Sequence, residues 1–308
     1  MSINHFTNAD SFLASATGPI RFNMTNDFMF KTVLQRNNHV LISLICALLH
    51  LEESAIQSAV VQNPIEPGER IDDKTVILDV KVLLNNNAIL DLEMQVVNKG
   101  NWVERSSYYL CRNYANLSSG SGYKLVQPSY QIGFLDYTLF PDYPEFYAVN
   151  LFMNKRTHQI YTDKLRISVI DLTQIDLATE EDRLYKIDQW ARLFKATTWE
   201  ELKMLTFPDS VLAEAGETIY KVSADEHMRQ LLEAREDAIR QELDVQWAMD
   251  HTTKQLNEAV AKLDAATAER DAATAERDAA TAKLDAALAL LKKHGIDPNE
   301  ENNSKSQK

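Results

Sequence analysis

The amino-acid sequence predicts an α/β domain, with a sheet flanked by helices, followed by a helical region and a C-terminal coiled coil. Segments in which apolar and polar residues alternate lie between residues 75 and 172, and segments of helical spacing precede and separate them. From Thr179 onward the spacing is helical, with Pro208 and Gly216 as the main interruptions. The last part of the chain repeats every seven residues, as coiled coils do.

Composition sets the broad class of the protein. The 308 residues are 45% hydrophobic and 25% charged, which suits one large globular domain with an appendage. Two cysteines, Cys46 and Cys111, are too few for a disulfide framework and fit a reduced, cytoplasmic setting. Residues 1–20 lack the pattern of a signal peptide and no segment approaches the length of a membrane span, so we expect a soluble protein with no membrane partner.

The formal net charge of -13 argues against broad, nonspecific adhesion to nucleic acid. Residues 180–250 hold 17 acidic and nine basic side chains, so much of the excess lies in that segment. The acidity therefore belongs mainly to the helical middle of the chain, and not to the segments that predict the sheet.

Two short helices are expected before the first strand. Asn26 can cap a helix that starts with Asp27, and the apolar spacing of this helix continues to Leu34. A second helix is predicted over residues 39–51. The prolines, glycine and charges of residues 64–73 then predict a loop.

The period next changes to two, which predicts a β-hairpin. Residues 75–84 and 88–97 alternate in polarity, and three asparagines lie between them. If those asparagines form the whole turn, Leu84 pairs with Ala88. The alternation then gives the hairpin a core face that carries Val76, Leu78, Val80, Val82, Leu90, Leu92, Met94 and Val96.

The other face of the hairpin carries Asp79, Lys81, Asp91, Glu93 and Gln95. In this register Asp79 lies opposite Glu93, and Lys81 lies opposite Asp91. Opposed like charges destabilise a hairpin unless something neutralises them, and a divalent cation with oxygen ligands would do so. The alternative is a solvent-exposed face on which Lys81 pairs with Asp91 or Glu93.

The remaining elements follow in order. Residues 102–117 have helical spacing and end at the Ser-Gly segment 118–122, whereas 130–137, 147–152 and 165–172 predict strands, two of them in the sheet interior. Two groups of aromatic side chains are expected in the core: Tyr108, Tyr109, Tyr114 and Tyr123 against the sheet, with base stacking as the alternative, and Trp190, Phe194 and Trp199 in the helical region.

The C-terminal repeat allows two different seams. Ala-Glu-Arg-Asp-Ala-Ala-Thr occurs at 268–274 and again at 275–281. One seam of coiled-coil period consists of Ala261, Ala265, Ala268, Ala272, Ala275, Ala279, Ala282 and Ala286; the other joins Leu256, Val260 and Leu263 to Leu284, Leu288 and Leu291 through threonines and arginines. The sequence does not choose between them. Residues after Gly295 are polar and are expected to fray.

Several short motifs resemble those of a known family. In chain order they are Asp27-Phe-Met-Phe-Lys31, Ile77-Leu-Asp-Val-Lys81, Leu92-Glu-Met-Gln95, Arg105 with Tyr108 and Tyr109, Tyr123 with Pro128 and Gln131-Ile-Gly-Phe-Leu135, Trp190-Ala-Arg-Leu-Phe194, Trp199-Glu-Glu201 and Arg235-Glu236. Asp79 and Glu93-Met-Gln95 alone resemble the core of PD-(D/E)XK nucleases. The ordered set is similar to the Rpn/YhgA-like family of recombination-promoting nucleases or transposase-like proteins of bacteria.

The resemblance implies a restriction-endonuclease-like mixed sheet flanked by helices, and a magnesium site with Asp79 and Glu93 as ligands. Asp27 is either a further ligand or a residue that only improves a helix N-terminus. Lys31 and Arg105 are candidates for contacts with DNA phosphates. Their alternative is to lie along amphipathic helices with their charges in solvent.

Position 95 departs from the wider superfamily, which usually has lysine where this chain has Gln95. Glutamine cannot act as a base or carry charge, but it can orient water through hydrogen bonds. Lys81, on the same face, could supply the missing charge, although a strand lysine opposite an acid is more often a structural ion pair. The candidate catalytic residues are therefore Asp79, Glu93, Gln95 and Lys81.

These observations predict a Mg2+-dependent DNA endonuclease of low sequence specificity, linked to recombination or mobile elements, that forms a homo-oligomer through its C-terminal helix. The alternative is a catalytically weak DNA- or protein-binding module that oligomerises through the coiled coil. The expected parts are an N-terminal arm (1–20), a nuclease-like domain (21–178), a helical extension (179–247), coiled-coil heptads (248–294) and a disordered tail (295–308).

Overall fold

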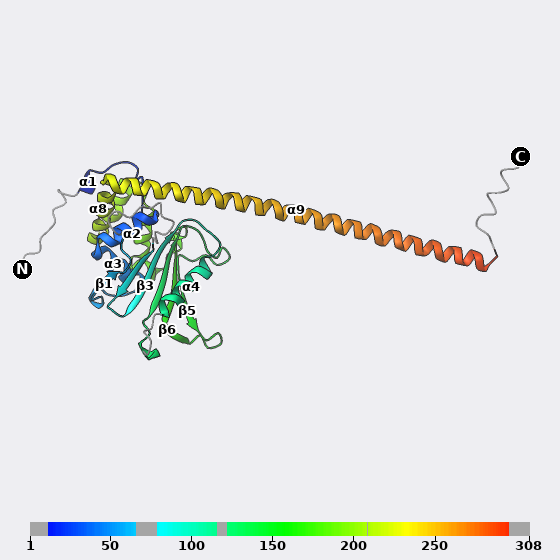
Figure 1. Ribbon diagram of the computed structural model, residues 1–308, viewed down its shortest axis with the longest axis horizontal. Coiled ribbons are helices and arrows are strands. Elements are labelled where there is room, and N and C mark those ends of the chain that lie inside the picture. Colours follow the sequence, from blue (N-terminus) through cyan, green and yellow to red (C-terminus); the bar gives the residue numbers. More distant parts are fainter. Residues whose placement is uncertain (1–11, 66–78, 116–121, 208, 296–308) are drawn as a thin grey trace, which may run out of the picture. The chain divides into compact units, whose positions relative to one another are not determined.

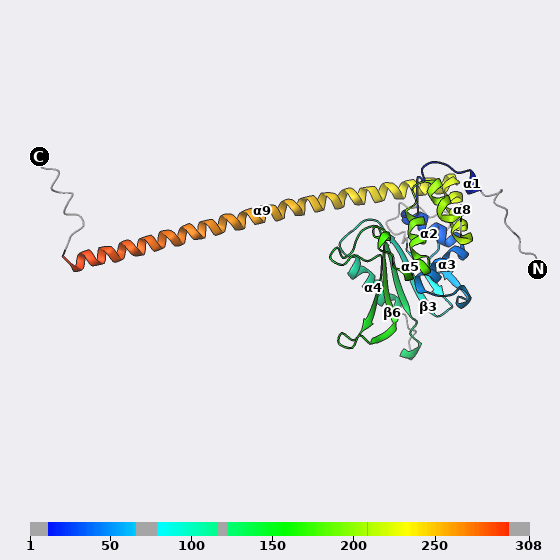
Figure 2. The same ribbon diagram turned by 180° about the vertical axis from the view of Figure 1, so that it is seen from behind.

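The computed structural model describes residues 12–65, 79–115, 122–207 and 209–295. The chain divides into two units, Met1–Gln246 and Trp247–Lys308. The first unit contains a mixed sheet flanked by helices, and the second contains the larger part of a long C-terminal helix. The predicted α/β class, with its mixed sheet and its helical C-terminal part, is confirmed (Figure 1, Figure 2).

The sheet has six strands in the order β1-β2-β3-β4-β6-β5. Their bounds are β1 Ala59–Val61, β2 Val80–Leu84, β3 Ala88–Gln95, β4 Ser129–Leu135, β5 Tyr147–Met153 and β6 Ile160–Asp171. Strand β4 runs parallel to both β3 and β6, and the other neighbours are antiparallel. Because β3 and β4 lie at the centre, almost all their side chains are buried on both faces.

The predicted hairpin register is confirmed where the strands pair. Leu84 pairs with Ala88, and Lys81 pairs with Asp91. Asn85 and Asn86 close the turn with φ values of 50° and 53°, in the left-handed region that asparagine tolerates better than most residues. Pairing begins at Val80, so Asp79 directly precedes the strand, and residues 75–78 of the expected strand lie outside the described residues, as does most of the expected 64–73 loop.

Nine α-helices belong to the described residues: α1 Phe12–Ser15, α2 Asp27–Arg36, α3 Asn38–Leu49, α4 Trp102–Tyr114, α5 Glu180–Leu184, α6 Ile187–Lys195, α7 Trp199–Thr206, α8 Ser210–Ala224 and α9 Glu226–Lys293. Helix α2 begins as predicted, because the Asn26 side chain accepts hydrogen bonds from the backbone N–H groups of Phe28 and Met29. This cap fixes Asp27 at the first helical position, where it faces the site described below.

Helices cover both faces of the sheet. On one face, Phe30 of α2, Phe134 of β4 and Phe194 of α6 make mutual ring contacts with centroids 5.3 to 5.6 Å apart. On the other face, Trp102 of α4 packs with Leu135 of β4 and with β6. Consecutive residues of β4 thus belong to different cores, as strand alternation requires.

Two expectations about the helical parts need correction. Gly216 does not interrupt a helix; it lies inside α8, where a Cβ atom would come within 2.7 Å of Leu202 Cδ2 and 2.9 Å of Leu13 Cδ2. Glycine is there because α8 packs closely on its neighbours. Tyr108 and Tyr123 are not core residues, being 62% and 89% exposed, because α4 buries a different face that is small and partly polar.

The expected core positions Trp190, Phe194 and Trp199 are confirmed as buried. Strand β1 was not predicted, since its three residues are too few for a periodic signal. Pro208 and most of the 118–122 segment lie outside the described residues. None of the described helices contains a stretch long and apolar enough to cross a membrane.

The predicted long helix at the C-terminus is confirmed, since α9 continues without a break from Glu226 to Lys293. Within residues 247–295 no side chain is buried, and Leu256, Leu263 and Leu284 are 60% to 66% exposed. Pairing of this segment into a coiled coil therefore stays a prediction, as does the choice between its two seams.

Candidate active site

The polar face of β3 is buried. Asp91, Glu93 and Gln95 are only 3%, 7% and 8% exposed, so the alternative of a solvent-exposed face is wrong. Helix α4 packs over the neighbouring strands β4 and β6 and turns the buried polar side chains Ser106 and Asn113 toward the sheet side of the helix. Asp91, Glu93 and Gln95 are alternate residues on one face of β3, and buried polar groups need hydrogen-bond or ion-pair partners. The residues that supply these partners define the site.

Asp91 is the most strongly perturbed carboxyl of this face. Burial, the charge of Asp79, a hydrogen bond to Asp79 and the charge of Glu93 raise the pKa of Asp91 to about 8, against a lowering by Lys81. No N–H or O–H donor of a described residue bonds its buried Oδ1 atom. Asp79 and Asp91 therefore lie within hydrogen-bonding reach of each other, with too little positive charge around them.

Glu93 is neutralised by an arginine from α4. Burial raises the pKa of Glu93 to about 7, the positive charge of Arg105 opposes that rise, and the charges of Asp79 and Asp27 add to it. Arg105 Nη2 lies 2.7 Å from Glu93 Oε1. The structure thus brings both Asp79 and Asp27 close enough to Glu93 for their charges to affect it.

Lys81 reaches the acids through an amide. Its Nζ atom donates a hydrogen bond to Asn113 Oδ1 at 2.9 Å, and Asn113 Nδ2 donates to Asp91 Oδ2 at 3.4 Å. The expected direct pair between Lys81 and Asp91 or Glu93 is not among the ion pairs of the described residues. Asn113, on α4, stands between the two charges.

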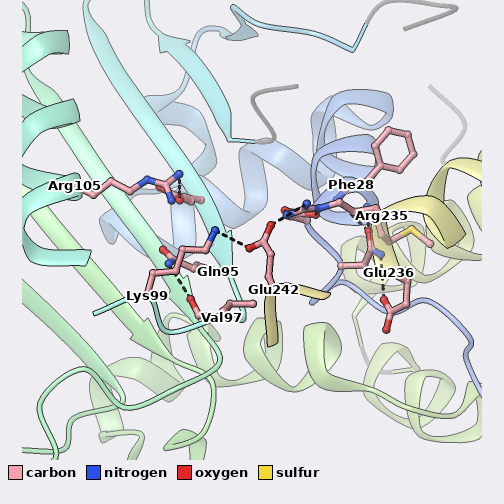
Figure 3. Close-up of polar contacts among 12 residues, drawn as sticks. Phe28, Gln95, Val97, Lys99, Arg105, Arg235, Glu236 and Glu242 are labelled. Atoms are coloured by element: carbon pink, nitrogen blue, oxygen red, sulfur yellow. Dashed lines mark hydrogen bonds and ion pairs between the residues drawn. The ribbon is translucent and has the colours of Figure 1, made fainter. Parts of the chain in front are cut away.

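Gln95 has one satisfied end and one free end. Its Nε2 atom donates to the backbone carbonyl of Val97 at 3.0 Å, whereas its buried Oε1 atom has no hydrogen-bond partner among the described residues (Figure 3). The donor bond fixes which end of the amide is oxygen. A buried acceptor without a donor costs free energy, so a water molecule or other donor is expected there.

Asp27 is bound by an arginine from the far end of the unit's sequence. Arg235 Nε and Nη2, on α9, donate to the two carboxylate oxygens of Asp27 at 2.7 and 2.6 Å. Arg235 Nη1 lies 3.6 Å from Glu242, which in turn pairs with Lys99 at 2.6 Å (Figure 3). This ion network joins α2, α9 and the segment after β3.

The two predicted phosphate contacts differ in their surroundings. Lys31 is buried on α2 at 3% exposure. Arg105 is 38% exposed in its side chain, binds Glu93, and lies over the ring of Tyr109 with its Cζ atom 5.8 Å from the centroid. Both assignments stay predictions.

The residues of this site fit a magnesium ion by their chemistry. Asp79, Asp91 and Glu93 supply hard oxygen ligands, and no donor group of a described residue bonds Asp91 Oδ1. Burial is the largest cause of the raised pKa values of Asp91 and Glu93, so a nearby cation would favour their charged forms. Across the described ranges no group of three or more His, Cys, Asp or Glu side chains is close enough to hold a metal. Magnesium does not require such a group, because it keeps several waters and binds through one or two carboxylates and substrate phosphates.

Sequence reasoning missed two members of this site. Asp91 was considered only as a partner for Lys81, although its position two residues before Glu93 places it on the same face. Arg235 was noted in a motif without a role. No local pattern could have assigned it, since its contact with Asp27 spans 208 residues.

Comparison with known proteins agrees with this geometry. A family model described as PD-(D/E)XK nuclease family transposase matches residues 24–252. The matched range contains the whole sheet and every residue of the site, from Asp27 to Glu242. No match was found among curated proteins or among solved structures.

Proposed function

The chain belongs to the PD-(D/E)XK nuclease family transposases, and from this premise we propose that it is a Mg2+-dependent endonuclease that hydrolyses DNA phosphodiester bonds with little sequence specificity. The observation that carries the proposal is the cluster formed by Asp79 with the buried acids Asp91 and Glu93. Burial raises the pKa of Asp91 and of Glu93, and no donor group of a described residue bonds Asp91 Oδ1, so a cation bound beside them would stabilise the charged forms of both acids.

Asp79 and Glu93 are the proposed metal ligands, with Asp27 as a further one. Asp91, beside Asp79, is added as a ligand or as the proton-sharing neighbour of one. Magnesium, when bound, supplies positive charge that activates water and stabilises the phosphate during attack. Glu93 pairs with Arg105 and Asp27 pairs with Arg235, so a bound ion would share with these arginines the balancing of the acids' negative charge.

Gln95 is proposed to orient the attacking water. Its buried Oε1 atom accepts no hydrogen bond from a described residue, while its Nε2 atom is held by Val97. An amide oxygen accepts a proton donor without removing the proton, so Gln95 positions water and does not act as a base. Lys81 is proposed to add positive charge beside Asp91 through Asn113.

Low sequence specificity is part of the proposal. Cations such as Arg105 and Lys99 can bind phosphate oxygens, and such contacts carry no sequence information. A phosphate-directed activity agrees with roles in recombination or in the movement of genetic elements. The two free cysteines, Cys46 and Cys111, suit a reducing bacterial cytoplasm.

The decisive test is cleavage of supercoiled plasmid with Mg2+ and with a chelator. We expect nicked or linear product only with Mg2+, because the acids need the cation to activate water. Asp79→Ala and Glu93→Ala should each lower the rate by at least about 100-fold while the far-ultraviolet circular dichroism stays unchanged. If either variant cuts at the wild-type rate, the site assignment is wrong.

A second candidate function is a catalytically weak module that binds DNA or protein and oligomerises through its C-terminal helix. Two observations favour it: Gln95 stands where the superfamily usually has lysine, and Glu93 and Asp27 are already neutralised by arginines. The two functions differ in their need for metal. A nuclease needs the cation for turnover, whereas a binder responds to divalent ions only as to other salt.

A further inference from the structure

The first turns of α9 carry a side chain into the site. Met228, Leu232 and Ile239 are the buried apolar residues of this helix, and their spacing of four and seven puts them on one face. Arg235 lies between Leu232 and Ile239 on the same face, three residues after one and four before the other. The apolar contacts therefore fix the rotation of the helix that turns Arg235 toward Asp27.

Arg235 occupies both oxygens of Asp27. The two donor distances of 2.7 and 2.6 Å make a bidentate pair, and the side chains are only 20% and 13% exposed. A metal ion chelated by both oxygens would need the lone pairs that the guanidinium uses, whereas a metal bound to one oxygen could use the lone pair on its other side. The pair and the proposed Asp27 ligand bond thus exclude each other, at least in part.

Among the described residues, the other acid paired with Arg235 is Glu242, whose Oε1 atom lies 3.6 Å from Arg235 Nη1 (Figure 3). Glu242 is shared, because its Oε2 atom lies 2.6 Å from Lys99 Nζ, so a released Arg235 would keep only part of one negative charge. A partly buried guanidinium without an anion is unfavourable. The planar fork of arginine binds phosphate oxygens in the same two-pronged way in which it binds a carboxylate.

We propose that Arg235 is a phosphate-binding residue of the active site, held on Asp27 until a divalent cation takes that carboxylate and frees the guanidinium for the DNA backbone. This inference rests on the proposed function, because it needs a metal at Asp27. It makes cation and DNA bind cooperatively: the cation exposes a phosphate ligand, and the phosphate keeps Arg235 from returning to Asp27.

The test measures the coupling between cation and DNA directly. Full-length protein is titrated onto a short fluorescent DNA duplex at constant ionic strength, once with chelator and once with Ca2+, used in place of Mg2+ to limit cleavage. We expect Ca2+ to tighten DNA binding of the wild type by at least about tenfold. In Arg235→Gln the gain should fall below about threefold, while Ca2+ alone, measured by calorimetry, binds at least as tightly as to the wild type.

Arg240→Gln is the matched control. It removes the same charge from the same helix, but Arg240 is 66% exposed and pairs with Asp237, away from Asp27. This variant should keep the wild-type gain. Arg235→Lys keeps the charge without the planar fork, so it should also lose most of the gain, and it decides the matter if Arg235→Gln does not fold.

An equal gain in the Arg235 variants and in Arg240→Gln would overturn the inference and leave Arg235 as an anchor for α9. Weaker Ca2+ binding to Arg235→Gln would overturn it too, because the arginine would then support the cation and not compete with it. Both of these results are compatible with Mg2+-dependent plasmid cleavage by the wild type. If the wild type neither cuts DNA with Mg2+ nor binds Ca2+, the proposed function and the inference fail together.

Discussion

Asp91 makes the stability of the folded protein depend on pH. Its pKa is raised to about 8, first by burial and then by Asp79, so the folded protein favours the protonated form that the unfolded chain gives up near pH 4. The contribution of Asp91 to the free energy of unfolding is therefore fully present below that pH and is lost as the pH rises toward 8. Glu93, with its pKa raised to about 7, acts in the same direction.

We predict that Asp91→Asn removes part of this loss. In chelator, the wild type should lose at least about 1 kcal/mol more unfolding free energy than the variant between pH 5 and pH 8, because the amide has no charge to bury. Urea unfolding at the two pH values measures the difference. A gap between variant and wild type that is the same at pH 5 and pH 8 would contradict the assignment.

Substitutions of Gln95 test whether this residue orients the attacking water or must be replaced by a group that can transfer a proton. Gln95→Ala removes the free Oε1 acceptor and should lower the Mg2+-dependent cleavage rate by about tenfold or more. Gln95→Lys restores the residue usual in the superfamily and should keep or raise the rate. Steady-state cleavage of plasmid, with Ca2+ affinity as a control, checks both. Lost activity in the lysine variant at unchanged cation affinity would show that the neutral amide is required.

The face of each hairpin residue could be predicted from sequence, but its burial could not. Strand alternation is a local property, so Asp79, Lys81, Asp91, Glu93 and Gln95 were placed on one face from their spacing alone. The burial of Asp91, Glu93 and Gln95 comes from α4 and from the parallel neighbour β4, which lie later in the chain. The same long-range packing raises the pKa of Asp91 and of Glu93, which no local sequence pattern predicts.

At the scale of elements, α4 depends on one glycine of the sheet. A Cβ atom at Gly133 of β4 would lie 2.2 Å from Trp102 Cζ2 and 2.4 Å from Cη2. Trp102 is the first residue of α4 and is 2% exposed, so its ring has no open space to enter. The helix that carries Arg105 and Asn113 is thus seated through a contact that tolerates no side chain.

We predict that Gly133→Ala destabilises the protein by about 1 to 3 kcal/mol, because the strand or the helix must move to admit the methyl group. Denaturant unfolding measures the change. Gly122→Ala is the control, since a Cβ atom there meets nothing within 4 Å, and it should alter stability by less than about 0.5 kcal/mol. Equal effects of the two substitutions would mean that the Trp102 ring moves away from the new methyl group at little cost in free energy.

Elements with strong local signals were predicted well. The hairpin register followed from the asparagine turn, and α2 followed from its asparagine cap, both of which involve neighbours in sequence. The order of the strands did not follow, because β6 lies between β4 and β5. Gly216 was misread because a glycine that ends a helix and a glycine that admits a packed neighbour look alike in sequence.

At the scale of the whole molecule, the two units share one helix. The first unit ends at Gln246 and so includes Arg235, Ile239 and Glu242, which contact the site region, whereas the second begins at Trp247. The alanine seam of the second unit buries little apolar area at about 25 cal/mol per Å2, so its association is expected to be weak unless the first unit raises the local concentration.

We predict that truncation after Asp250 leaves metal-dependent cleavage intact, because every residue of the site is retained. The truncated protein should be a smaller oligomer than the full chain in analytical ultracentrifugation. Plasmid cleavage on the same samples checks the first part. An unchanged oligomer number would remove the assembly role of the helix, and loss of cleavage would show that residues beyond 250 belong to the catalytic unit.

The repeat on α9 also allows the helix to differ in length without a change in its faces. Two identical copies of seven residues follow each other at 268–274 and 275–281 on one uninterrupted helix. Seven residues make close to two helical turns and about 10 Å of length, so one copy more or fewer returns the following residues to nearly the same face. A gain or loss of one copy would therefore change the length of α9 by a whole step while keeping both seams in register.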